Sequence, residues 1–114
     1  MTWKLGKLPP RHDPRTLQLA DYLLPVLPPA PPYRHWGHGI TAWGMMGNDR
    51  IGDCTTAAAG HAIQTWTANA SNEVTISDAA VIAAYSAVTG YNPADPTTDR
   101  GAVVLDVLNY WRSP

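Results

Sequence analysis

Proline is the residue that most constrains this chain, because eight of its eleven prolines lie within the first 32 residues. A proline fixes φ and has no amide hydrogen, so a segment this rich in proline cannot continue as a helix or as a central strand. We therefore expect an extended arm over residues 1–33 and a folded domain over residues 34–114. Within the arm, residues 25–32 predict a stiff polyproline II rod, and residues 16–24 predict a short helix or strand.

Three helices are expected after the arm, and the predicted fold class is mainly α. Asp53, Ser77 and Asp99 are suited to cap the helix starts, and Gly90 is suited to end the second helix in a left-handed conformation. The helices are expected over residues 54–68, 78–89 and 100–111. Apolar residues at helical spacing predict the buried faces: Ala59, Ala62, Ile63 and Trp66, then Val81, Ala84, Tyr85 and Val88, then Val104, Val107, Leu108 and Trp111.

Composition excludes several function classes. The 8 Lys and Arg nearly balance the 9 Asp and Glu, which gives no electrostatic reason to expect nucleic acid or an anionic membrane as partner. No signal peptide and no apolar stretch of membrane-spanning length is visible, so we expect a cytoplasmic protein or one assembled into a virion. The single cysteine permits no internal disulfide.

That cysteine, Cys54, is the residue placed most suggestively for chemistry. It falls in the first turn of the first predicted helix, where the helix dipole favours a thiolate, although Asp49 and Asp53 are close in sequence and only Arg50 compensates them. His61 is two helical turns, about 10 Å, further along the same helix, which is too far for a catalytic base. We expect His61 to be a partly buried structural residue.

No metal or cofactor is expected. His35, His38 and Cys54 are too few and too unfavourably spaced for a closed zinc site. The loop with Asn92, Asp95 and Asp99 lacks the order of acidic residues in a calcium loop, and the glycines follow no phosphate-binding pattern.

Several short motifs resemble those of papain-like cysteine peptidases. Asn48 stands six residues before Cys54, and Gly52-Asp53-Cys54 leads into the helix, where that family has a Gln and Gly-Ser-Cys. Residues 33–36 (YRHW) resemble the start of the mature enzymes. Residues 74–80 resemble the opening of their second helix, and residues 101–111 resemble their third. The likeness spans residues 33–111 and implies the helical, left-hand half of the papain-like fold.

The resemblance implies that Cys54 is a nucleophile and that Asn48 donates to the oxyanion. Asn is one methylene shorter than the usual Gln, and Thr55 replaces the Trp that usually follows the cysteine. The family's catalytic histidine and its orienting Asn belong to a β-rich domain that would follow residue 114. We therefore expect a peptidase- or amidase-derived module that is inactive or incomplete as this chain, and whether it is an enzyme stays open.

A non-catalytic role is the alternative. The proline-rich arm and the open face of the first helix could hold another protein chain or a second copy, as in a self-assembling or virion-type structural component.

Overall fold

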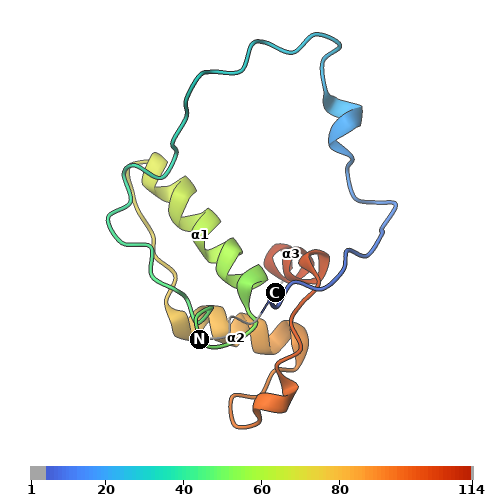
Figure 1. Ribbon diagram of the computed structural model, residues 1–114, viewed down its shortest axis with the longest axis vertical. Helices are drawn as coiled ribbons and strands as arrows, with labels where there is room; N and C mark the ends of the chain where they lie inside the picture. The colour runs from blue at the N-terminus through green and yellow to red at the C-terminus, as the bar shows by residue number, and fades with distance from the viewer. Residues whose placement is uncertain (1–4, 114) are drawn as a thin grey trace.

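The computed structural model describes residues 5–113, so the first four residues of the expected arm and residue 114 lie outside the described residues. The regular structure consists of three α-helices and two 3-10 turns: η1 (Leu19–Tyr22), α1 (Cys54–Asn69), α2 (Asp78–Thr89), η2 (Pro96–Thr98) and α3 (Val104–Arg112). The three α-helices contact one another, and residues 5–113 contain isolated β-bridges but no strand. The fold is mainly α, as the sequence predicts (Figure 1).

The caps of α2 follow the sequence prediction. The Ser77 hydroxyl accepts a hydrogen bond of 3.2 Å from the Ala80 amide. Gly90 ends the helix with φ at +76°, and its amide donates to the Ser86 carbonyl over 2.8 Å. These contacts satisfy backbone groups that a helix leaves open at each end.

Neither predicted acidic cap makes a side-chain capping bond. Asp53 is the N-cap residue of α1, as predicted, but its side chain accepts no hydrogen bond from the first turn of the helix. Asp99 does not cap α3 either, because its carboxylate bonds to Gly52 and Tyr85, and α3 begins only at Val104. Between Asp99 and the start of α3, the chain passes through Gly101 at φ +78°, a left-handed conformation that a right-handed helix cannot include.

The predicted buried faces are only partly correct. Val81 and Tyr85 of α2 are buried, but on α3 only Val107 is. On α1 the buried residues are small or polar, and Trp66 is 61% exposed. The buried residues of α1 are Thr55, Thr56, Ala57, Gly60 and Gln64. The small ones let neighbours approach, and a Cβ on Gly60 would lie 2.6 Å from the Met46 sulfur.

The core consists of two small clusters. One contains Met46, Ala57 and Val81, with Ile76 packed against it. The other contains Tyr85, Ala102 and Val107, with Ile51, Ala59, Val88 and Tyr91 packed against it. Because these clusters are small, much of the apolar surface of the three helices stays accessible.

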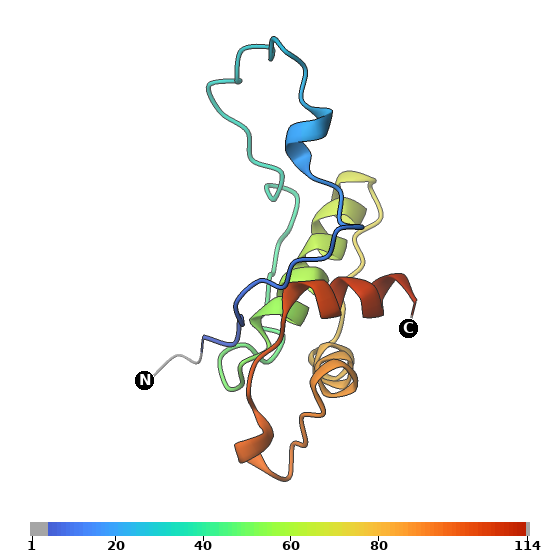
Figure 2. The same cartoon turned by 90° about the vertical axis from the view of Figure 1, so that its right-hand side faces the viewer.

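The arm loops away from the helices (Figures 1 and 2). Every residue from 14 to 36 is exposed. The radius of gyration is 16.3 Å, whereas a compact domain of this length has about 13 Å. The arm therefore contributes extent to the molecule but little to its core.

The first described residues are nevertheless fixed to the domain. Ala102 donates to the Gly6 carbonyl over 2.7 Å and accepts from the Leu8 amide over 3.0 Å. A Cβ on Gly6 would overlap the Gly52 carbonyl, and a Cβ on Gly101 would overlap the Gly6 carbonyl. Three glycines therefore allow three backbone segments to cross next to the start of α1.

Candidate functional site

Cys54 is the first residue of α1, and its side chain is partly buried. It lies at the edge of a groove of about 340 Å³ between α1 and α3. Among the described residues, only Lys7 and Thr55 bring polar side chains to this groove. Besides Cys54, its other lining residues are Ala58, Ala59, Ala62, Trp66, Val104, Val107, Leu108 and Trp111. The thiol therefore borders an apolar surface.

Two tryptophans form the far end of this groove. Trp66 of α1 and Trp111 of α3 stack with their ring centroids 5.7 Å apart and their planes 18° from parallel. Leu108, beside them, is 49% exposed. An exposed aromatic and aliphatic surface of this kind is typical of a site that something covers.

Asn48 is separate from that groove, since it is not among the residues that line it. It lies in the turn that precedes α1, where its backbone amide donates to the Met45 carbonyl over 3.0 Å. Its side-chain oxygen is buried and has no hydrogen-bond partner among residues 5–113. An oxyanion site with Asn48 would therefore lie on the side of α1 that faces this turn.

Asp53 is fully buried immediately before Cys54, and neither of its carboxyl oxygens has a hydrogen-bond partner within the described residues. It lies so close to Gly47 that a Cβ there would be 2.9 Å from Oδ2. Burial, and then the charges of Asp99, Asp49 and Asp78, raise the pKa of Asp53 from 3.8 to about 7. The carboxyl is therefore neutral over most of the acidic range.

Asp99 joins three segments of the backbone. Its carboxylate accepts from the Gly52 amide at 3.1 Å and from the Tyr85 hydroxyl at 2.7 Å. The same hydroxyl accepts from the Gly101 amide over 2.8 Å. Burial, and then this bond to Asp99, raise the pKa of Tyr85, which keeps the phenol protonated as a donor. This network fixes the turn before α1 against α2 and against the residues that lead to α3.

The histidines do not reach the thiol. His61 donates from Nε2 to the Trp43 carbonyl over 3.1 Å and packs edge-on against the Trp43 ring, so it is a structural residue as predicted. His38 contacts the His35 carbonyl at 2.7 Å. No histidine of residues 5–113 lines the groove at Cys54.

The residues that fasten the loop of residues 34–53 to α1 were not predicted from the sequence. Gln64, fully buried, donates to the Ala42 carbonyl and to Glu73 over 2.9 and 2.8 Å. Asn69 donates to the Trp36 carbonyl over 2.7 Å. The available signal was the position of Gln64 on the same helix face as Ala57 and Gly60, since an amide side chain on a buried face needs hydrogen-bond partners.

Within the part of the chain that the structure describes, no three His, Cys, Asp or Glu residues gather in a way that could hold a metal ion. None of the described helices has the length and apolarity needed to cross a membrane. No family model, no curated protein and no solved structure matches the chain.

Proposed function

We propose that this chain is a papain-like cysteine peptidase- or amidase-derived module in which Cys54 is the nucleophile. The observation that carries the proposal is the place of the thiol: it is partly buried, at the first residue of a sixteen-residue helix, beside an open groove. The unpaired amide groups at a helix N-terminus give this end a partial positive charge, which stabilises a thiolate.

The acidic neighbours of Cys54 oppose this charge less than their sequence positions indicate. Burial holds Asp53 in its neutral form up to a pH of about 7. Arg50 lies 3.6 Å from Asp49 and 3.8 Å from Asp78, so its single positive charge offsets part of the negative charge of these two exposed carboxylates. The N-terminus of α1 therefore keeps its favourable field at mildly acidic pH.

In the proposed reaction, the Cys54 sulfur attacks an acyl carbon that lies on the side of α1 facing the turn of Asn48, outside the groove, and the Asn48 side-chain amide and the Cys54 backbone amide donate to the oxyanion. A thioester then forms as the amine leaves with a proton from a general acid, and water releases the acyl group. The acid and base would be a histidine supplied by a chain or domain that docks beside Cys54, because no described histidine lines its groove.

The test compares alkylation rates within one groove. Cys54 in the natural chain is compared with a cysteine introduced by Ala58→Cys in a Cys54→Ala background, one turn further along α1 and lining the same groove. Ala58 is exposed, so access alone favours the introduced thiol. We expect iodoacetamide at pH 6, followed by intact mass, to modify Cys54 at least about ten times faster. An equal or slower rate at Cys54 would exclude an activated nucleophile.

A second candidate is the non-catalytic structural or binding module. The exposed apolar residues of the arm and of the α1–α3 groove favour it, because surfaces of this kind mark protein contacts. Native mass spectrometry tests this candidate. It predicts a stable oligomer that the substitution Leu108→Glu dissociates, while a monomer under all conditions contradicts self-assembly.

A further inference from the structure

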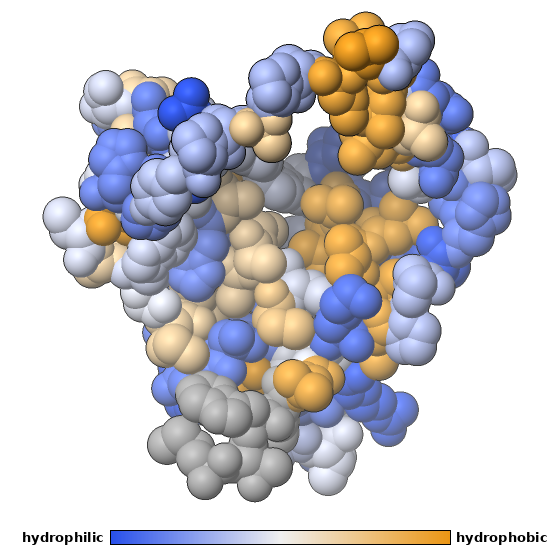
Figure 3. Space-filling view, turned by 45° about the horizontal axis from the view of Figure 1, so that its top comes forward, coloured by the Kyte–Doolittle hydropathy of each residue, from blue (hydrophilic) through white to orange (hydrophobic). Residues whose placement is uncertain are grey.

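Two separate apolar surfaces of this molecule are exposed. One is the arm segment 17–27, which includes Leu19 at 74% exposure and Leu24 at 65%. The other is the α1–α3 groove with Trp66, Leu108 and Trp111. Figure 3 shows apolar residues gathered on the arm and, across a hollow, on the helical body.

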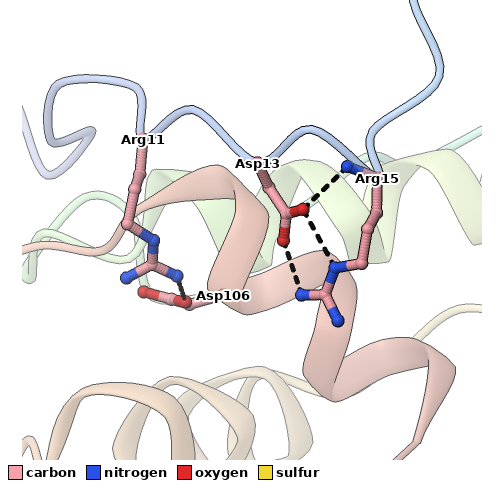
Figure 4. A network of polar contacts seen from close by, with 4 residues as sticks. All are labelled: Arg11, Asp13, Arg15 and Asp106. Atoms are coloured by element: carbon pink, nitrogen blue, oxygen red, sulfur yellow. Dashed lines mark hydrogen bonds and ion pairs between the residues drawn. The ribbon is translucent and has the colours of Figure 1, made fainter.

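The arm is fixed to both helices that form this groove. At its first end the Arg11 guanidinium pairs with Asp106 of α3 (Figure 4). Asp13 and Arg15 bond to each other over 2.6 to 3.0 Å and, with Thr16, border a hollow on α3. At the other end the Asn69 side chain of α1 holds the Trp36 carbonyl. Segment 17–27 is therefore part of a loop that α3 holds at one end and α1 holds at the other (Figures 1 and 2).

We propose that segment 17–27 is a strap that folds onto the α1–α3 groove of its own chain and covers Trp66, Leu108 and Trp111. Burying both surfaces removes apolar area from water, which is the force that closes the strap. The strap is favoured over a second copy, because two fixed ends keep it near the groove at an effective concentration in the millimolar range.

The sequence of the arm suits this movement. Residue 17 follows the part of the arm that borders α3, which ends at Thr16, so a hinge at residue 17 leaves the anchor in place. Leu19 and Tyr22 stand three residues apart in η1, so they lie on one side of it, because a 3-10 helix has three residues per turn. Residues 25–32 contain five prolines, which make this stretch semi-rigid, so the strap moves onto the groove with little internal bending there.

The test is a cross-link in a Cys54→Ala background, so its outcome is independent of any reactivity of the natural thiol. Leu24→Cys is paired with Leu108→Cys in the groove. The control pairs Leu24→Cys with Val74→Cys, and Val74 is 40% exposed. It belongs to the connection between α1 and α2, a segment that runs on the other side of α1 from α3 in Figure 1. Disulfides are formed under a glutathione redox buffer and identified by intact mass without reductant.

We expect an intramolecular disulfide between positions 24 and 108 that forms at least tenfold faster than the control. A disulfide-linked dimer would overturn the strap and identify a second copy as the occupant of the groove. Equal rates for the two pairs, or no disulfide, would also overturn it.

A second readout uses the natural chain. Cys54 lines the groove at the opposite end from Trp66, twelve residues or about 18 Å along α1. The eleven residues of segment 17–27 span up to about 35 Å when extended, so a closed strap is long enough to cover both ends and shield the thiol. Replacing Leu23 and Leu24 with Asp should speed modification of Cys54 by a bulky maleimide several-fold, while Val74→Asp should leave the rate unchanged. An unchanged rate in the double variant would contradict the strap even if the thiol itself is activated.

Discussion

At the scale of single residues, two fully buried polar side chains, Asp53 before α1 and Tyr85 of α2, differ in their hydrogen bonding. The Tyr85 hydroxyl donates to Asp99 and accepts from the Gly101 amide. By contrast, neither carboxyl oxygen of Asp53 has a hydrogen-bond partner among the described residues. A buried carboxyl without partners avoids the cost of an unpaired charge by keeping its proton. The neutral form of Asp53 is thus a property of the fold, and it is also what leaves the field at Cys54 favourable.

Asp53 should therefore make stability fall as pH rises. In the unfolded chain its carboxyl loses the proton near its ordinary pKa of 3.8, and in the folded chain near 7. The folded state thus binds more protons between these values, and the free energy of unfolding decreases as pH rises through this window. The stability that the protonated Asp53 carboxyl contributes is fully lost once the pH exceeds its folded-state pKa of about 7.

The substitution Asp53→Asn should remove this slope, because the amide is neutral at every pH. Above pH 7 we expect the variant to be more stable than the natural chain by about 1–3 kcal/mol, since one pKa unit corresponds to about 1.4 kcal/mol. Urea unfolding at pH 5 and pH 8 measures the effect, with the exposed Asp21→Asn as control. A variant that keeps the natural slope would show that Asp53 is ionised in the fold.

At the scale of the elements, α3 separates a buried residue from an exposed one at consecutive positions. Val107 is 4% exposed within the second core cluster, and Leu108 is 49% exposed on the groove. We expect Val107→Ala to lower the free energy of unfolding by about 1–3 kcal/mol. Leu108→Ala should lower it by less than about 0.5 kcal/mol when both are measured in a chain whose strap is disabled by Leu23→Asp and Leu24→Asp. Chemical denaturation compares the two substitutions in that background. Equal losses there would mean that something other than the strap covers the groove face of α3 in solution.

The crossing of three glycine segments gives a second prediction at this scale. Gly101→Ala places a side chain at φ +78° against the Gly6 backbone, so it should destabilise the protein by about 1–3 kcal/mol or detach the first residues of the arm. The control is Gly39→Ala, where a Cβ meets nothing within 4 Å and φ is not positive. The two thermal unfolding midpoints should differ by several degrees. Similar midpoints would contradict the close crossing.

The sequence predicts elements better than it predicts what they bury. Local chemistry determines where α2 begins and ends, and Ser77 and Gly90 carry that information. The start of α1 is also predicted correctly from Asp53, although its side chain makes no capping bond. Which face of α1 is buried depends on residues distant in the sequence. The Met46 side chain packs where Gly60 has no Cβ, and the Gln64 side chain donates to the Ala42 carbonyl. Trp66 fits a core stripe by its spacing but lies on a groove. Cys54 could be recognised as a candidate from its position in the sequence. The aromatic groove beside it could not, because it forms only when α1 and α3 pack together.

At the scale of the whole molecule, the arm divides the chain into regions of unequal protection. Residues 14–36 are exposed throughout. By contrast, the Leu8 amide is bonded to Ala102, and the turn after Gly47 holds the amides of Arg50 and Ile51. Proteolysis needs an exposed and locally adaptable backbone, so susceptibility should follow this division.

Trypsin should therefore cut first after Arg34, which lies outside both the proposed strap and the anchor at Trp36. Arg15 follows more slowly, because its backbone and side chain are bonded to Asp13. Arg100 is protected, since the next amide, that of Gly101, is buried and bonded to Tyr85. A time course read by intact mass gives the order, and Arg34→Gln should move the first cut to Arg15. First cuts after Arg50 or Arg100 would show that the helical body opens before the arm does.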